Sequence, residues 1–133
     1  MADSFNIPEL AAPFGAFSSA AWAPAGRQLF ISGLVARDAE GRLVGRGDMA
    51  AQTRQTLRNM EAILRSVGAT FKEVAVVTVF VTDMSKLDVI HEVRREYFKP
   101  PYPASTLVQV VSLVDPELLI EINAVAVVPE RPR

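Results

Sequence analysis

The most informative candidate for chemistry is a glutamate inside an apolar run near the end of the chain. Glu121 lies in the segment Leu118–Val125, in which Asn123 is the only other polar residue. Because side chains alternate along a strand, Glu121 and Asn123 share one face, opposite Ile120 and Ile122. Burying a charged carboxylate in apolar surroundings costs free energy unless it is paired or protonated. Such surroundings favour the protonated form, which is useful to a general acid or base that works near neutral pH. The alternative is a half-exposed strand whose polar side chains simply face solvent.

A second candidate combines the chain's single histidine with a nearby arginine. His91 and Arg94 lie three residues apart, on one helical stripe with Leu87 and Tyr97. Such a pair beside apolar residues can line the mouth of a cleft. The alternative is that it borders a buried face, with the arginine stem covering that face. One histidine excludes metal centres built on histidine pairs, and the absence of a G-x-S-x-G elbow argues against a serine triad.

Smaller residues at strand ends are weaker candidates. Phe17 and Ser18 open the first apolar segment, where a phenylalanine is more often core than ligand contact. Gly33 ends another segment and can allow a backbone or a ligand to approach closely. Ser105 and Thr106 begin a strand after a proline–alanine pair, where hydroxyl residues usually serve as turn or cap residues. Taken alone, none of these residues indicates a site.

Composition restricts the classes of protein that the chain can belong to. It has 133 residues, no cysteine and a formal net charge of −1. Disulfides, thiolate metal sites and a cysteine nucleophile are therefore excluded. A basic stripe for nucleic acid is missing. No apolar run approaches the ~20 residues that a membrane span needs, and the start does not resemble a signal peptide, so we expect a cytoplasmic protein that contacts neither membrane nor nucleic acid.

The first half of the chain predicts a β-hairpin followed by a helix. Two short apolar segments, Ala16–Trp22 and Gln28–Val35, flank a proline–glycine turn, which is typical of a hairpin. A glycine-punctuated loop, Arg37–Gly47, comes next. Apolar residues then recur every three or four positions, with Asp48 as the expected N-cap and Gly68 as the expected stop.

The second half predicts strand, helix and two strands. Val74–Thr82 is almost entirely apolar or β-branched, as in a buried central strand. Ser85 is the expected N-cap of a helix running from about Lys86 to Tyr97. Two further strands are expected at Thr106–Val111 and Leu118–Val128.

The resulting order ββ–α–β–α–ββ predicts a single α+β domain over residues 1–133. Strand–helix–strand units place both helices on one face of a mixed sheet. No elements remain to cover the other face. We therefore expect that face to be buried by self-association, in a closed cyclic oligomer.

Six segments follow one another in a recognisable order and spacing: Ala12–Ser18, Leu29–Gly33, Gln52–Met60, Val76–Asp83, Tyr102–Val110 and Leu119–Ile122. Together they resemble the Rid (reactive intermediate deaminase, or YjgF) family over nearly the whole chain. The resemblance implies a chorismate-mutase-like fold assembled as a homotrimeric barrel with clefts between subunits. It also implies hydrolysis of enamines or imines with release of ammonia and without a cofactor.

The resemblance assigns roles, and one of its key residues is absent. Active relatives hold the substrate carboxylate with an arginine after proline–alanine, where this chain has Ser105. The water-positioning glutamate is retained as Glu121, and the family's glycine as Gly33. Phe17 replaces the usual tyrosine, and His91 occupies a position that is often asparagine.

Two functional hypotheses follow. The first is a hydrolase for an enamine, imine or related C–N metabolite other than the usual 2-imino acids, because Ser105 replaces the arginine. The second is a non-catalytic trimeric module that binds a small molecule or a partner. In the first hypothesis Glu121 is catalytic, no metal or cofactor is required, and the expected substrate-binding residues are Phe17, Ser18, Gly33, His91, Arg94, Ser105 and Leu107.

Overall fold

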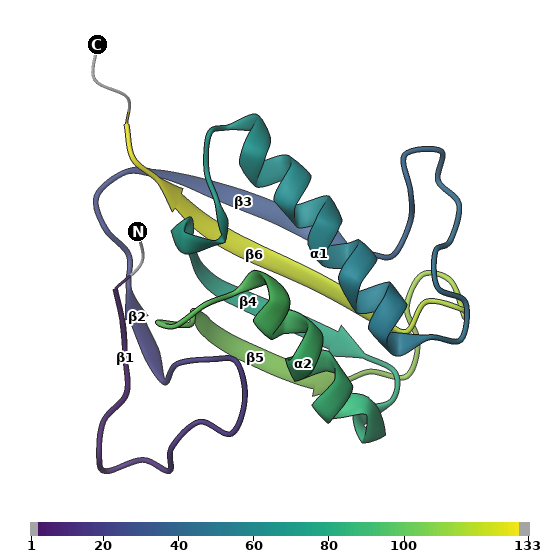
Figure 1. Cartoon of the computed structure of the whole chain (residues 1–133), viewed down its shortest axis with the longest axis horizontal. Coiled ribbons are helices and arrows are strands. Elements are labelled where there is room, and N and C mark those ends of the chain that lie inside the picture. Colours follow the sequence, from purple (N-terminus) through teal and green to yellow (C-terminus); the bar gives the residue numbers. More distant parts are fainter. Residues whose placement is uncertain (1–2, 131–133) are drawn as a thin grey trace.

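The computed structural model describes residues 3–130 and shows two helices packed on a four-stranded sheet (Figure 1). The strand order is β3-β6-β4-β5, in which β4 and β5 are parallel and the other pairs are antiparallel. The elements are β1 (Asp3–Phe5), β2 (Ala20–Trp22), β3 (Arg27–Leu34), α1 (Met49–Ser66), η1 (Phe71–Glu73), β4 (Val74–Val81), η2 (Met84–Lys86), α2 (Leu87–Tyr97), β5 (Ala104–Gln109) and β6 (Ile120–Val128). The predicted α+β architecture is therefore confirmed.

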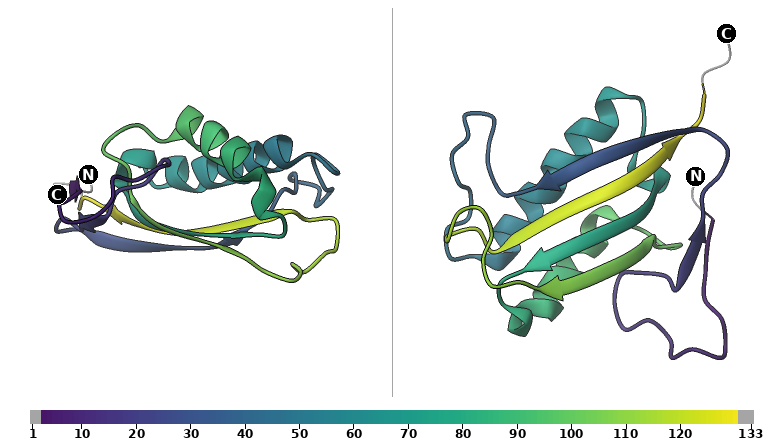
Figure 2. Two further views of the ribbon diagram at one scale, coloured as in Figure 1. Left: turned by 90° about the horizontal axis from the view of Figure 1, so that it is seen from below. Right: turned by 180° about the vertical axis from the view of Figure 1, so that it is seen from behind.

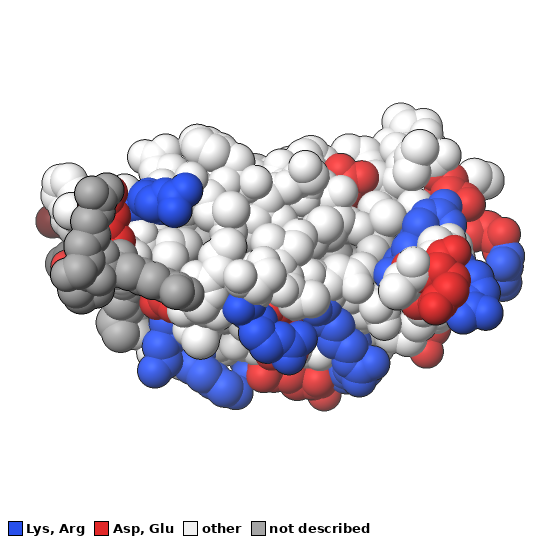
Figure 3. Space-filling model, turned by 90° about the horizontal axis from the view of Figure 1, so that it is seen from above, with Lys and Arg blue, Asp and Glu red and all other residues white. Residues whose placement is uncertain are grey.

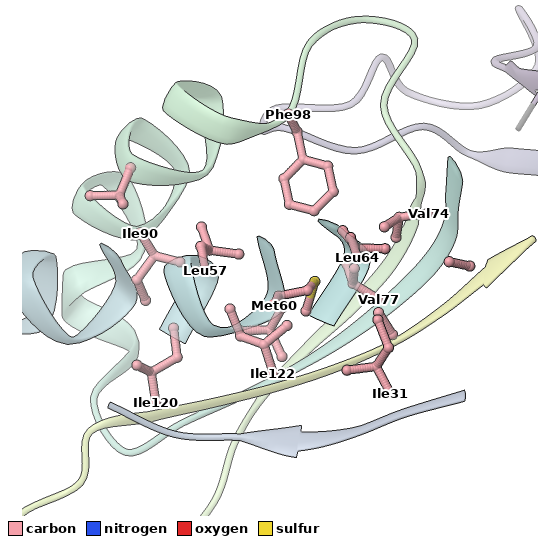
Figure 4. Close-up of a cluster of buried hydrophobic side chains, with 14 of the residues drawn as sticks. Ile31, Leu57, Met60, Leu64, Val74, Val77, Ile90, Phe98, Ile120 and Ile122 are labelled. Carbon is pink, nitrogen blue, oxygen red and sulfur yellow. The ribbon is translucent and has the colours of Figure 1, made fainter. Parts of the chain in front are cut away.

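Both helices lie on the same face of the sheet, as the left view of Figure 2 shows. The core fills the space between these two layers. Leu57, Met60 and Leu64 of α1 are fully buried, as the helical spacing predicts, and they meet Ile120 and Ile122 of β6 (Figure 4). Alternation along each strand thus separates a helix-facing row from an outward-facing row.

The first helix begins and ends where the sequence predicts. The Asp48 carboxylate accepts a hydrogen bond from the Ala51 N–H at 3.0 Å, which satisfies a free donor at the start of α1. The helix closes at Val67, and Gly68 follows with φ +74°, a left-handed conformation that suits glycine.

The entry to the second helix differs from the prediction. Lys86 precedes α2 and makes no side-chain capping bond, whereas Asp83 caps the 3-10 turn before it, because the Asp83 side chain accepts a hydrogen bond from the Ser85 N–H at 3.0 Å. The short 3-10 turn η2 follows before α2 begins at Leu87. The Ser85 hydroxyl is engaged by the same Asp83 carboxylate at 2.6 Å, so it is not available to cap α2.

The predicted N-terminal hairpin is wrong. β2 pairs with β1 in a separate two-stranded sheet, and β3 pairs with β6. The physical reason is a long-range contact: the Ser18 N–H donates to the carbonyl of Pro103, and Ser18 forms a bridge with Ala104 at the start of β5. This contact ties the N-terminal segment to the edge of the sheet opposite β3.

The sheet leaves its second face uncovered in the single chain, as the right view of Figure 2 shows. We call this surface the open face. Phe30 is 72% exposed on it, and Val76 and Val108 are also exposed. Figure 3 shows charged side chains mainly along the helix layer at the lower edge and at the right-hand end, with few charges toward the sheet. No helix in residues 3–130 is long and apolar enough to cross a membrane.

The C-terminal strands are slightly displaced from their predicted bounds. β5 starts at Ala104 rather than Thr106, because its parallel pairing with β4 begins there. β6 starts at Ile120, two residues after the predicted beginning.

Candidate functional site

A pocket of about 330 Å³ lies where α2, the start of β5 and the N-terminal loop meet. Its lining comes from segments far apart in the sequence. The residues are Phe14, Phe17, Met84, Leu87, His91, Arg94, Ser105 and Leu107. Three polar side chains therefore lie among five apolar ones, which is the usual composition of a small-molecule site.

Arg94 is the most unusual residue of this pocket, because its side chain is only 1% exposed. Its Nη2 donates to the Ala16 carbonyl at 3.2 Å and to the Ser105 hydroxyl at 3.1 Å. Its Nη1 is buried and has no partner among residues 3–130. Burial, with a contribution from Arg95, lowers the pKa of Arg94 to about 10, so the guanidinium remains charged at neutral pH.

His91 lies one helical turn before Arg94 and is held by the same backbone segment. The Ala16 N–H donates to His91 Nδ1 at 3.2 Å. Burial lowers the pKa of His91 to about 4, and the charges of Arg94 and Arg95 add to this effect. The ring is therefore neutral near pH 7, and because Nδ1 accepts, the proton resides on Nε2.

The imidazole of His91 is also fixed by its neighbours. The ring of Phe14 meets it edge-on at a centroid distance of 6.0 Å, and the ring of Phe17 lies at 6.4 Å. Gly15 is packed so closely against the imidazole that a Cβ at this position would overlap it. The N-terminal loop thus forms one wall of the pocket.

Ser105 and Leu107 enter the pocket from β5. They pair with Val77 and Val79 of β4, whose side chains are buried on the helix side of the sheet. Neighbouring residues in register point to the same face. Ser105 and Leu107 therefore face α2, which explains the contact between Ser105 and Arg94.

Glu121 lies on the other face of the sheet. Its registered partner on β4 is Phe80, which pairs in turn with the exposed Val108 on β5. The carboxylate is packed against Gly33, where a register shift in the pairing of β3 with β6 falls between Ile31 and Leu34. Glu121 is half-buried on the open face, away from the pocket.

The structure therefore divides the predicted site into separate groups. Phe17, His91, Arg94, Ser105 and Leu107 line one pocket. Ser18 lies beside it and lines a neighbouring cavity. Gly33 and Glu121 contact each other elsewhere.

Sequence reasoning did not assign Phe14, Met84 or Leu87 to the site, although they line the pocket. Leu87 could have been found, because it lies four residues before His91 on the helical stripe. Phe14 and Met84 lie outside α2 and β5, and no local pattern places them there. A larger cavity of about 480 Å³, beside Arg27, Val67 and Val128, contains none of the predicted site residues.

The described residues offer no group of three or more histidine, aspartate or glutamate side chains placed to hold a metal ion. The polar groups of the pocket are an arginine, a neutral histidine and a serine. What the pocket offers a ligand is therefore hydrogen bonds and positive charge.

A buried glutamine connects the two loops at one end of the sheet. Gln52 Nε2 donates to the carbonyls of Gly45 at 3.2 Å and Glu117 at 2.9 Å. Its Oε1 accepts from the Leu119 N–H at 2.8 Å. This network fixes the backbone two residues before Glu121.

Comparison with known proteins identifies the family. The model of the endoribonuclease L-PSP family matches residues 9–128, nearly the whole chain. The chain belongs to this family, also called the Rid family. A conserved Rid family protein of unknown function from Yersinia pestis has the same fold, with a TM-score of 0.88 and 36% identity over 96% of this chain and 98% of that one.

Two relatives carry names that describe an activity. The 3-aminoacrylate deaminase RutC of Acinetobacter baylyi is 39% identical, covering 74% of this chain and 77% of the relative. The human 2-iminobutanoate/2-iminopropanoate deaminase is 36% identical, covering 76% of this chain and 73% of the relative. The Rid family therefore includes proteins named as deaminases of enamines and imines.

Proposed function

We propose that this Rid family chain hydrolyses the C–N bond of an enamine or imine in a cleft between copies of itself. The observation that carries the proposal is the separation of two half-sites. The pocket around Arg94 lies on the helix side of the sheet, and Glu121 lies on the open face. Because the sheet separates them within one chain, we propose that a neighbouring chain presents its own Glu121 to the pocket.

The uncovered apolar surface supports assembly. Phe30, Val76 and Val108 expose apolar side chains on the open face. A contiguous apolar surface of this kind usually marks a protein contact. We propose a homotrimer, in which each open face is covered by neighbouring copies and three clefts form.

The reaction would proceed by addition of water. Glu121 accepts a proton from water while the water oxygen forms a bond to the imine carbon, and it then passes this proton to the imine nitrogen. In the resulting carbinolamine the hydroxyl proton moves through Glu121 to the nitrogen, the C–N bond breaks, ammonia leaves and a carbonyl group remains. Water supplies all the added atoms, so the reaction balances without a metal or a cofactor. An enamine first loses a proton from nitrogen and gains one on carbon, which gives the imine, and then follows the same course.

We propose that the substrate differs from the small 2-imino acids of the usual members. The resemblance gives position 105 to an arginine in active members, whereas this chain has Ser105, and a hydroxyl provides neither the charge nor the paired donors of a guanidinium. Phe17 and Leu107 also contribute apolar lining to the pocket.

The test is ammonia release from freshly generated 2-aminoacrylate and from imino acids with larger side chains. A Glu121→Gln variant should lose about 100-fold or more in turnover, in the range expected for a general base. The matched control is Glu61→Gln, on the exposed side of α1. Full turnover in Glu121→Gln would refute the role of Glu121. Tight ligand binding without ammonia release from any substrate would favour the non-catalytic module.

A further inference from the structure

We propose that Arg94, presented by α2, binds a carboxylate group of the ligand, a role that the resemblance gives to an arginine at position 105, and that this ligand carries an apolar side chain. This inference rests on the proposed function for its site but concerns a different property, the recognition of the substrate. It assigns the specificity of the pocket to a residue on a helix.

The first step is the state of the guanidinium. Arg94 is 1% exposed, and no ion pair joins it to a carboxylate in residues 3–130. Its Nη2 has two neutral oxygen partners, and its Nη1 has none. A buried charge is costly unless an opposite charge or a full set of hydrogen bonds compensates it. An anion in the adjoining pocket would supply what the protein does not.

The second step is the direction of the hydrogen bonds. The Ser105 hydroxyl accepts from Arg94 Nη2, so its own hydrogen is free to be donated. His91 Nδ1 accepts from the Ala16 N–H, so the ring offers Nε2–H. The polar side chains of the pocket therefore present donors. A ligand that fits them presents acceptors, and a carboxylate does so with a matching charge.

The third step is the apolar lining. Phe14, Phe17, Leu87 and Leu107 surround the polar groups. The ring of Phe14 is 75% exposed at the edge of the pocket, available to cover a ligand. A ligand of two or three carbons would leave these walls in contact with water, whereas a branched or aromatic side chain would cover them.

The fourth step is the contact between Arg94 and Ser105. The guanidinium of Arg94 reaches the side chain of residue 105 itself, at 3.1 Å from its hydroxyl. A second arginine at 105 would bring two like charges into contact. The small, uncharged Ser105 is therefore compatible with the buried Arg94, and the positive charge of the pocket comes from α2 rather than from β5.

The experiment measures binding of 4-methyl-2-oxopentanoate, a carboxylate of the size of the expected product, against its uncharged amide. Isothermal titration calorimetry on the intact assembly is the readout. We expect the natural protein to bind the carboxylate at least about tenfold more tightly than the amide. Pyruvate should bind more weakly than the larger acid. Arg94→Met should abolish the preference for the carboxylate, and Arg94→Lys should retain part of it.

Arg95→Met is the matched control, because Arg95 is the adjacent exposed cation on the same helix. It should bind like the natural protein. If Arg94→Met does not fold, the comparison of acid with amide in Arg94→Lys decides, because this variant keeps a charge but loses the paired donors. Ser105→Ala removes one of the two contacts of Nη2 and should weaken carboxylate binding several-fold. No preference for the acid in the natural protein, or a preference that survives in Arg94→Met, would overturn the inference.

The two proposals fail in different ways. Carboxylate binding that depends on Arg94, without ammonia release, contradicts the hydrolase and leaves the anion site intact. Ammonia release that depends on Glu121 but is unchanged in Arg94→Met contradicts the anion site and leaves the hydrolase intact.

Discussion

The carboxylate of Glu121 is packed directly against the Cα of Gly33, so that even a methyl group at position 33 would overlap it. Gly33 is exposed to solvent, and the atom that it would meet is the end of a flexible side chain. The contact between these two residues therefore sets the position of the carboxylate more than it sets the stability of the fold.

Gly33→Ala should accordingly displace Glu121 at little cost in stability. We expect the free energy of unfolding to fall by less than about 1 kcal/mol, because the side chain can turn aside. Ammonia release should fall at least tenfold if Glu121 acts on water. Adding Gly33→Ala to a Glu121→Ala protein should change turnover no further. A Gly33→Ala protein with full activity would contradict the role of this contact.

The equivalent substitution at Gly15 should behave differently. A Cβ there overlaps the ring of His91, which is 5% exposed and hydrogen-bonded to the Ala16 N–H, so that it cannot easily move. We expect Gly15→Ala to lower the free energy of unfolding by about 1–3 kcal/mol. Urea unfolding monitors this loss, and Gly15→Ala combined with His91→Ala should recover part of it. An unchanged unfolding midpoint in Gly15→Ala would show that the N-terminal loop moves to accommodate the methyl group, and it would contradict the prediction.

Stability should depend on pH through His91. Its pKa is about 4 in the folded chain and 6.5 in the unfolded chain. Between these values the unfolded chain binds a proton that the folded chain does not, so the free energy of unfolding decreases as pH falls from 6.5 to about 4. The total loss is at most about 3 kcal/mol. Above pH 6.5 His91 contributes no slope.

The measurement is urea unfolding over this pH range for the natural protein and for His91→Gln, at one protein concentration. Carboxylates such as Asp38 and Asp83, whose pKa values are lowered by hydrogen bonds, contribute equally to both proteins. The difference between the two curves therefore isolates His91. Parallel curves would contradict the prediction.

Removing the amide of Gln52 should destabilise the protein. Gln52→Leu leaves the Leu119 N–H and two carbonyls without their partner. Buried polar groups without partners are costly, and we expect a loss of about 2–4 kcal/mol in the free energy of unfolding. Gln55→Leu is the control on the same helix. Gln55 bonds Asn59 at 2.9 Å and lies only half-buried, so its loss should be under about 1 kcal/mol.

A charge on the open face should prevent self-association. Phe30→Glu places a carboxylate where Phe30 is 72% exposed, and burying that charge between copies would be costly. Light scattering should show a trimer for the natural protein and a smaller species for the variant. The same substitution on the helix side, Ala62→Glu, should leave the trimer intact. A monomeric natural protein would contradict the proposed assembly.

Local signals in the sequence predicted the parts of the fold that depend on local chemistry. Asp48 and Gly68 were recognisable because capping needs particular side chains and conformations within a few residues. The N-terminal hairpin was predicted wrongly because Ser18 contacts Pro103, 85 positions away, and nothing near Ser18 signals it.

The site was predictable to a similar degree. The spacing of His91 and Arg94 placed them on one helical stripe, and alternation placed Glu121 opposite Ile120 and Ile122. That Arg94 touches Ser105, whereas Glu121 lies on the opposite face, depends on strand order and helix packing. Neither is encoded in spacing along the chain.

The two bonds of Ala16 have a consequence for how the pocket can vary. Its N–H fixes His91 and its carbonyl fixes Arg94, and both groups belong to the main chain. No substitution at position 16 other than proline deletes either of them. The link between the N-terminal loop and the pocket therefore does not depend on the type of side chain at position 16. A change in the length of this loop would break the link, whereas alanine scanning of the same loop would not detect it.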